Sequence, residues 1–396
     1  MAGIGKLETP MMPAAPRVFT LDGQMLAAVK TRIAAGEPAF AAPLVRLRRE
    51  ADQALTEGPW SVVEKTTVPP GGDKHDYLSL ARYFWPDPAA PDGLPYISRD
   101  GEVNPEIFTI PDHRHFDALL ANVPTLALAW YLTGEERYAG HAAGLLRTWF
   151  LDEETRLNPH LRYAQGIRGL NDGRPTGLIE ARELALLVDA LGLLAGSAAW
   201  CASDRQGMDR WLGEYLAWLV ESDLGRAEAR QANNHGTYYD AQVAALALYL
   251  GEDGLAGAVA GKAPGRIATQ IEPDGRQPLE LARTLAWHYS LFNLQALYRL
   301  VRLGEHVGLD VWHFRTPDGR SLRAATDFIV PYVQGKLWNY AQILPQEFGL
   351  AFAVLCQAAV KYDCPAYYHA ALAAPGVDPA ADRVRLLLGM PEDASL

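Results

Sequence analysis

The sequence contains few cysteines, no long apolar run and no excess of basic residues, and each absence excludes a class of protein. Its three cysteines among 396 residues, Cys201, Cys356 and Cys364, do not have metal-site spacing. No apolar segment is long enough to cross a bilayer. The 47 acidic residues outnumber the 36 basic ones, giving a formal net charge of −11, which argues against general nucleic-acid binding. We therefore expect neither a membrane nor nucleic acid as a partner, and no oligomeric state is predicted.

Residues 1–17 are rich in Pro, Ala and Gly, which predicts a flexible tail ahead of a single domain over residues 18–396. No signal peptide is recognisable in the tail. We therefore expect a cytoplasmic protein, or a periplasmic or secreted one if a leader was removed. A local cluster of basic residues in a cleft would still allow an acidic ligand, because it can override the overall charge.

Helical periodicity dominates the chain. Helices are predicted at about 21–35, 41–55, 116–132, 135–151, 176–196, 203–222, 235–250, 254–270, 277–307, 322–334, 346–361 and 365–373. Two long irregular segments interrupt them, at about 62–111 and 152–174, and loops of this length are usually functional. Antiparallel helix pairs of this number either stack as a solenoid or close into an α/α toroid. The absence of a sequence repeat and the long loops favour an all-α toroid with a groove at one end, lined by loops and helix termini.

A polar cluster, Asn233-Asn234-His235, stands directly before the apolar run 241–250. Asn is a favoured N-cap residue, so the cluster predicts the start of a helix. The free N–H groups and positive dipole end of such a helix would suit an anion. The alternative is an ordinary capped helix with a hydrogen-bonded histidine.

A second polar stretch, residues 272–289, begins with a turn signal and continues into the helix predicted at 277–307. Glu280 and Arg283 are three residues apart, so they could pair on one helix face. Arg283 and Tyr289 would lie about 120° apart on an ideal helix. They would therefore meet only across a pocket or on an irregular helix. The alternative is a salt-bridged helix with an ordinary aromatic core.

In these motifs the sequence resembles the alginate lyase superfamily of polysaccharide lyases. The resemblance covers roughly residues 60–350 and rests on segments in the same order: 72–77 with 83–88, 157–165, 233–240 and 278–289. It implies an incomplete α/α toroid and the cleavage of 1,4-linked uronic acid polymers by β-elimination, with no cofactor and no metal. The expected partner is an acidic polysaccharide or oligosaccharide, either alginate (polymannuronate included) or glucuronan.

The resemblance also implies the roles of four residues. The C5 proton is weakly acidic while the adjacent carboxylate is charged, so donors must first neutralise that carboxylate. Asn234 and His235 match the neutralising positions with support from Arg283, and Tyr289 matches the acid/base tyrosine. A nearby cation is expected to lower the pKa of Tyr289 from about 10. Tyr289 alone suits syn elimination, as at β-D-mannuronate; at α-L-guluronate His235 could be the base and Tyr289 the acid.

The irregular segments are expected to hold neighbouring sugars through cations that pair with carboxylates and rings that stack on sugar faces. The predicted substrate-binding residues are Lys74, Tyr77, Tyr83, Arg99, Tyr163, Gln165, Arg174, Glu280 and His288. The alternative for the charged ones is that they are simply solvated.

Two other functions stay open from the residues alone. An inverting hydrolase on an α/α toroid would need two carboxylates, one with a raised pKa. Glu180, Asp240 and Glu280 are candidates, but nothing in the sequence pairs them. A non-catalytic uronan-binding protein would keep a basic, aromatic groove and lack the Tyr–His pair. His113 and His115 are predicted to be loop histidines ahead of the helix at 116–132.

Overall fold

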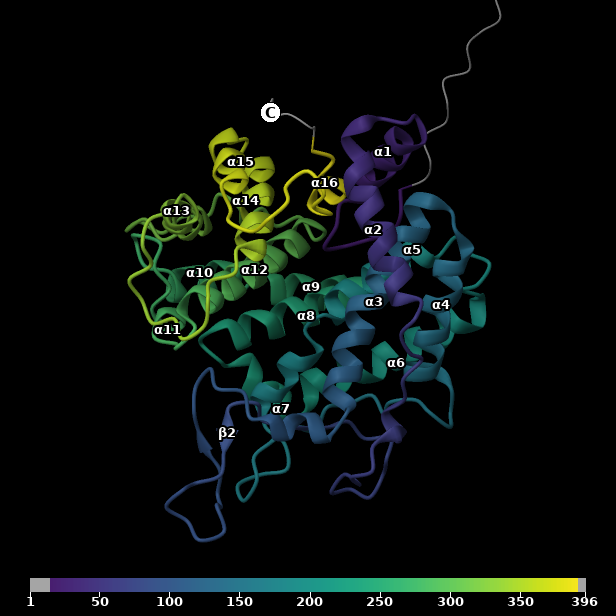
Figure 1. The fold of residues 1–396 in the computed structure, drawn as a ribbon, viewed down its shortest axis with the longest axis vertical. Coiled ribbons are helices and arrows are strands. Elements are labelled where there is room, and N and C mark those ends of the chain that lie inside the picture. Colours follow the sequence, from purple (N-terminus) through teal and green to yellow (C-terminus); the bar gives the residue numbers. More distant parts are fainter. Residues whose placement is uncertain (1–14, 391–396) are drawn as a thin grey trace, which may run out of the picture.

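The structure, a computed structural model, describes residues 15–390 and is an incomplete α/α toroid of helical hairpins around one buried core (Figure 1). The predicted all-α toroid is confirmed. The helices are α1 (Gly23–Ala34), α2 (Ala41–Ala54), α3 (Asp112–Thr133), α4 (Glu136–Leu146), α5 (Leu184–Leu194), α6 (Ala202–Glu221), α7 (Asp223–Ala229), α8 (Asn234–Leu250), α9 (Asp253–Ala260), α10 (Ala263–Gln270), α11 (Pro278–Leu281), α12 (Ala286–Glu305), α13 (Leu322–Val333), α14 (Gly349–Lys361), α15 (Pro365–Leu372) and α16 (Val384–Leu388).

Helix α8 lies at the centre of the fold. Fourteen of its 17 residues are buried, because it packs against α5, α6, α9 and α12. A helix that is buried on all sides has no polar face, so its bounds in the sequence are recognised from its capping residues. The Asn233 side chain caps its start, as predicted, and Gly251 ends it at a φ of 80°. The start of α8 follows closely on α7, which Figure 1 draws below α8.

The irregular segments contain four short strands that the sequence did not predict, and one pair of them joins the two segments to each other. Strand β1 (Leu78–Leu80) pairs in parallel with β4 (Tyr163–Gly166), and β2 (Phe84–Trp85) pairs antiparallel with β3 (Ile97–Ser98). Strands of two to four residues show no readable alternation, which is why the pattern was missed. Figure 1 places β2 at the same end as α7, far from α14–α16.

The helix predicted at 277–307 is wrong in one respect: it breaks between α11 and α12. Residues 284–286 bond to another segment instead: Ala286 N–H donates to Ala341 O at 3.0 Å, and Ile343 N–H donates to Thr284 O at 3.0 Å. A backbone that pairs with a distant segment cannot also continue the helical ladder. The region predicted as one helix at 254–270 is likewise two helices, α9 and α10.

The N-terminal boundary also differs from the prediction. Residues 1–14 lie outside the described residues, but Arg17, placed in the predicted tail, donates to Leu248 O at 3.0 Å. The predicted single domain over 18–396 stays a prediction. Among the described residues, no helix is long and apolar enough to cross a membrane.

Candidate active site

A cavity of about 660 Å³ lies where α8 and α12 begin, under the first irregular segment. Its lining includes four arginines (Arg82, Arg174, Arg182 and Arg283) and three histidines (His113, His235 and His288), against two carboxylates, Asp100 and Glu180. Because the four arginines outnumber the two carboxylates, the cavity attracts anions although the chain is acidic overall. The local basic cluster that the sequence analysis allowed is therefore present.

Asn234, the first residue of α8, is fully buried in the cavity wall. Its backbone N–H donates to Glu280 Oε1 at 2.8 Å, and its side-chain Nδ2 donates to Glu280 Oε2 at 2.7 Å. Its Oδ1 has no hydrogen-bond partner. Burial raises the pKa of Glu280 against the opposing effect of these hydrogen bonds. Both carboxylate oxygens of Glu280 therefore accept hydrogen bonds from Asn234. The predicted Glu280–Arg283 pair is wrong, because Arg283 pairs with Asp100 instead.

His235 is oriented by a carboxylate that the sequence analysis missed. Its Nδ1 lies 2.8 Å from Oε1 of Glu228, a buried residue of α7. A carboxylate oxygen accepts, so Nδ1 carries the hydrogen and Nε2 keeps its lone pair in the neutral ring. His235 lines the cavity, so this second nitrogen is the one available there. Such an imidazole is a proton acceptor.

Tyr289 and Arg283 meet in the cavity because the helix breaks between α11 and α12. The guanidinium carbon of Arg283 lies 3.6 Å from the centre of the Tyr289 ring, and the Tyr289 hydroxyl donates to the Tyr83 hydroxyl at 3.0 Å. Burial raises the pKa of Tyr289 well above its usual value and outweighs the lowering effect of Arg283. The predicted net lowering is therefore wrong, and Tyr289 is a neutral phenol.

Asp100 attaches the first irregular segment to the α11–α12 junction at the cavity. Arg283 Nε donates to Asp100 Oδ1 at 3.0 Å, and Thr284 N–H donates to Asp100 Oδ2 at 2.9 Å. Burial acts to raise the pKa of Asp100, but the hydrogen bonds from Arg283 and Thr284 prevail and hold it below its ordinary value. The charge of Arg283 is thus already paired with that of Asp100.

Four predicted substrate-binding residues line the cavity: Tyr83, Gln165, Arg174 and His288. Gln165 has a φ of 52°, a left-handed conformation that costs about 1–3 kcal/mol and is concentrated at functional sites. It accepts a hydrogen bond from Arg174, whose guanidinium carbon lies 5.0 Å from the centre of the Phe84 ring. His288 stacks on Phe292.

The other five lie elsewhere. Tyr77 is fully buried and donates to Glu180 at 2.8 Å, so the prediction that it stacks on a sugar is wrong. Glu280 is also buried and accepts a hydrogen bond from the Asn234 side chain, so it does not contact the sugar directly. Lys74, Arg99 and Tyr163 do not line the cavity, and their predicted contacts with more distant sugars stay predictions.

Five lining or supporting residues carry charge that sequence reasoning did not assign to the site. They are Arg82, Asp100, His113, Arg182 and Glu228. His113 and His115 also belong to α3 itself rather than to a loop before it. An isolated charged residue in a loop or helix has no local signal of its partner, so nothing in the sequence indicated that these residues belong to the site.

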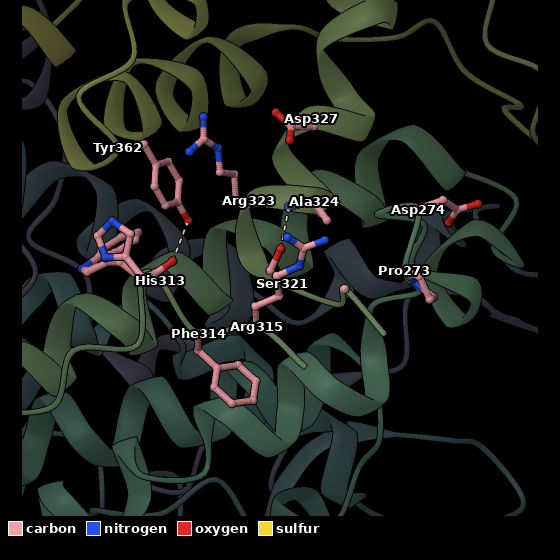
Figure 2. A pocket seen from close by; sticks show the side chains of 12 residues that line it. Pro273, Asp274, His313, Phe314, Arg315, Ser321, Arg323, Ala324, Asp327 and Tyr362 are labelled. Atoms are coloured by element: carbon pink, nitrogen blue, oxygen red, sulfur yellow. Dashed lines mark hydrogen bonds between the residues drawn. The ribbon is translucent and has the colours of Figure 1, made fainter. Parts of the chain in front are cut away.

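A second hollow, of about 560 Å³, lies beside α13 and the segment before it (Figure 2). Several of its polar groups help to hold the fold: the Tyr362 hydroxyl donates to Trp312 O at 3.2 Å, and Ser321 Oγ accepts from Ala324 N–H at 3.1 Å. Asp327 accepts a hydrogen bond from Tyr367. We therefore assign the chemistry to the cavity at the start of α8.

Comparison with known proteins agrees with this geometry. The alginate lyase family model matches residues 61–338. A crystal structure of an alginate lyase from Bacteroides ovatus is 37% identical, with a TM-score of 0.88 over 94% of this chain and 99% of that one. Alginate lyase A1-III from Sphingomonas species A1 shares the fold at 16% identity, with a TM-score of 0.61 over 97% of this chain and 100% of that one. No significant match was found among the curated proteins. The chain belongs to the alginate lyase family of polysaccharide lyases.

Proposed function

We propose that the enzyme cleaves alginate by β-elimination, using His235 as base and Tyr289 as acid at guluronate. At mannuronate, Tyr289 serves in both roles. The observation that carries the proposal is the pairing of an oriented imidazole, held by Glu228, with a neutral phenol in one basic cavity. The similarity to the Bacteroides ovatus alginate lyase supports the choice of substrate.

The first step is neutralisation of the uronate carboxylate next to C5. Asn234 sits at the start of α8, where the positive end of the helix dipole favours an anion, although its own backbone N–H and that of His235 already donate to Glu280 and Asn233. Arg283, between α11 and α12, supplies positive charge, although it also pairs with the Asp100 carboxylate. Withdrawal of charge from the carboxylate makes the C5 proton removable, because the developing enolate-like charge is then stabilised.

The stereochemistry of the sugar decides which residue takes the proton. At guluronate the C5 hydrogen and O4 are on opposite faces, so the two groups that act on them must also be on opposite sides. Nε2 of His235 accepts the C5 proton, and the neutral Tyr289 hydroxyl protonates the leaving O4 oxygen. Mannuronate and glucuronate differ only at C2, and both present C5–H and O4 on one face, where Tyr289 must do both tasks.

The hydrolase alternative has weaker support in this geometry. Asp240 is fully buried and paired with Lys262 at 3.1 Å and Arg266 at 2.9 Å. Both oxygens of Glu280 accept hydrogen bonds from Asn234. Glu180 lines the cavity but accepts from Tyr77 and Ser79, both buried. None of these carboxylates therefore forms the acid and base pair that an inverting hydrolase uses.

The function is tested by incubating the protein with polyguluronate, polymannuronate and glucuronan separately. We expect an unsaturated product that absorbs in the ultraviolet, formed faster from polyguluronate than from the two syn substrates. Reducing ends without that absorbance would indicate a hydrolase, and binding without either product would indicate a binding protein. Either result would overturn the proposal.

The variant Glu228→Gln is expected to slow polyguluronate cleavage by about 100-fold, in the range that general bases contribute. The amide can donate to Nδ1 of His235, which puts the hydrogen on Nε2 and removes the proton acceptor from the cavity. Polymannuronate cleavage should fall less than tenfold, because Tyr289 carries that reaction.

The readout is the ratio of initial rates on the two polymers, which a general loss of folded protein would not change. Glu214→Gln, a change of the same kind on the surface of α6, is the matched control and should leave both rates unaltered. An equal loss on both polymers would show that His235 does not act as the base.

A further inference from the structure

The NH₂ group of the Asn234 side chain is already engaged, because it donates to Glu280. The Oδ1 atom of the same side chain is buried without a partner in the cavity wall. An unpaired buried acceptor costs about 1–3 kcal/mol. The amide that should neutralise the substrate is therefore turned away from it while Glu280 is ionised.

Protonation of Glu280 changes this arrangement with no movement of backbone. Oε1 continues to accept the Asn234 backbone N–H, which lies at 2.8 Å. Oε2, now carrying hydrogen, donates to the amide oxygen of Asn234, because an amide can rotate by about 180° within the same volume. Both Glu280 oxygens and the Asn234 amide oxygen then have partners, and the NH₂ group is released from Glu280 for a substrate carboxylate.

We propose that Glu280 is a positioning residue that takes up one proton as substrate binds, turning the Asn234 amide so that its NH₂ group faces the uronate carboxylate. The inference rests on the proposed role of Asn234. The proton comes from solvent and forms one O–H bond on Oε2. No bond of the substrate changes in this step, and the proton is returned when the product leaves.

The surroundings of Glu280 favour this protonation once substrate is present. Arg283 from the α11–α12 junction and His235 from α8 favour the ionised form, and Tyr238 of α8 is a neutral neighbour. Burial acts the other way and prevails, so the pKa of Glu280 is raised in the ligand-free protein. A bound uronate adds a second negative charge beside it, and two adjacent carboxylates do not both stay ionised.

The variant Glu280→Gln tests the inference, because its amide permanently resembles the protonated acid. Its oxygen can accept the Asn234 N–H and its NH₂ group can donate to Asn234 Oδ1. We expect kcat/KM within about threefold of wild type at pH 6 and at least tenfold above wild type at pH 9, where wild-type Glu280 resists protonation. Loss of activity in Glu280→Gln at both pH values, as large as in Glu280→Ala, would overturn the inference.

A binding measurement keeps the test decisive if Glu280→Gln folds poorly. The affinity of Tyr289→Phe for a guluronate tetrasaccharide, measured by calorimetry, should weaken at least tenfold from pH 7 to pH 9, with net proton uptake in buffers of different ionisation enthalpy. A pH-independent affinity without proton uptake would overturn the inference. An inactive wild-type enzyme would instead refute the proposed function, so the two failures are distinguishable.

Discussion

Replacement of Tyr289 by phenylalanine is expected to lower kcat by about 10³-fold on polyguluronate and at least as much on polymannuronate. The hydroxyl supplies the proton to O4 in both reactions, and general acid–base groups typically contribute 10²–10⁴-fold. Phenylalanine keeps the ring that lies 3.6 Å from the Arg283 guanidinium, so the shape of the cavity is retained. Initial rates by ultraviolet absorbance and oligosaccharide affinity by calorimetry measure the two effects separately.

The matched control is Tyr249→Phe. The Tyr249 hydroxyl donates to Asp209 at 2.8 Å near the C-terminal end of α8, away from the cavity. This variant should retain wild-type rates. If Tyr289→Phe kept more than a tenth of the wild-type kcat, or if it lost oligosaccharide binding in parallel with turnover, Tyr289 would not be the acid.

The variant Lys65→Met is expected to destabilise the protein by about 3–5 kcal/mol at pH 8. Lys65 and Asp112 form an ion pair at 2.8 Å, and both side chains are fully buried. Lys65 Nζ also donates to the carbonyls of Val62 and Lys74, which anchors the first irregular segment to α3. Methionine fills the same volume but leaves the Asp112 carboxylate without a counter-charge. Urea denaturation measures the difference in the free energy of unfolding.

The size of this effect should depend on pH in a defined direction. Burial raises the pKa of Asp112 from 3.8 to about 6 even beside Lys65, and loss of Lys65 raises it further. A carboxyl group whose folded pKa is raised contributes stability at low pH and loses it as pH rises through the folded value. The deficit of Lys65→Met relative to wild type is therefore largest at pH 8 and shrinks toward pH 5.

The double variant Lys65→Met/Asp112→Asn is the control for the buried charge. The asparagine amide that replaces the carboxylate can still accept the Leu78 N–H, which lies at 3.0 Å, and it carries no charge. We expect the double variant to recover at least about half of the lost stability, since replacing both members of a buried pair costs less than removing one. A deficit that is independent of pH and not recovered in the double variant would contradict the electrostatic explanation.

Local features of the chain were predictable because they depend on neighbours in sequence. The N-cap Asn233, the helical periodicity of α3, α6 and α8, and the loop-rich segments all follow from propensity and spacing. The order of the motifs was sufficient to identify the family. The spacing of Arg283 and Tyr289 also showed that the two residues could not face each other on one continuous, regular helix.

The resolution of that conflict required the tertiary structure. The break between α11 and α12 depends on hydrogen bonds to residues 341 and 343, more than fifty positions along the chain. The burial of Tyr77 likewise comes from packing against α3, where its ring contacts Phe116. The reversed pKa shift of Tyr289 has the same origin, because desolvation depends on every element that covers the ring.

By itself, the sequence determined the class of reaction and the start of the helix that presents Asn234 and His235. Only the tertiary structure decided which charges are already engaged: Asp100 with Arg283, Glu280 with Asn234, and Glu228 with His235. Two of these partners, Asp100 and Glu280, lie at least 46 residues from the groups that they hold. The physical reason is that hydrogen bonds and ion pairs act over a few ångströms of space, whatever the separation along the chain.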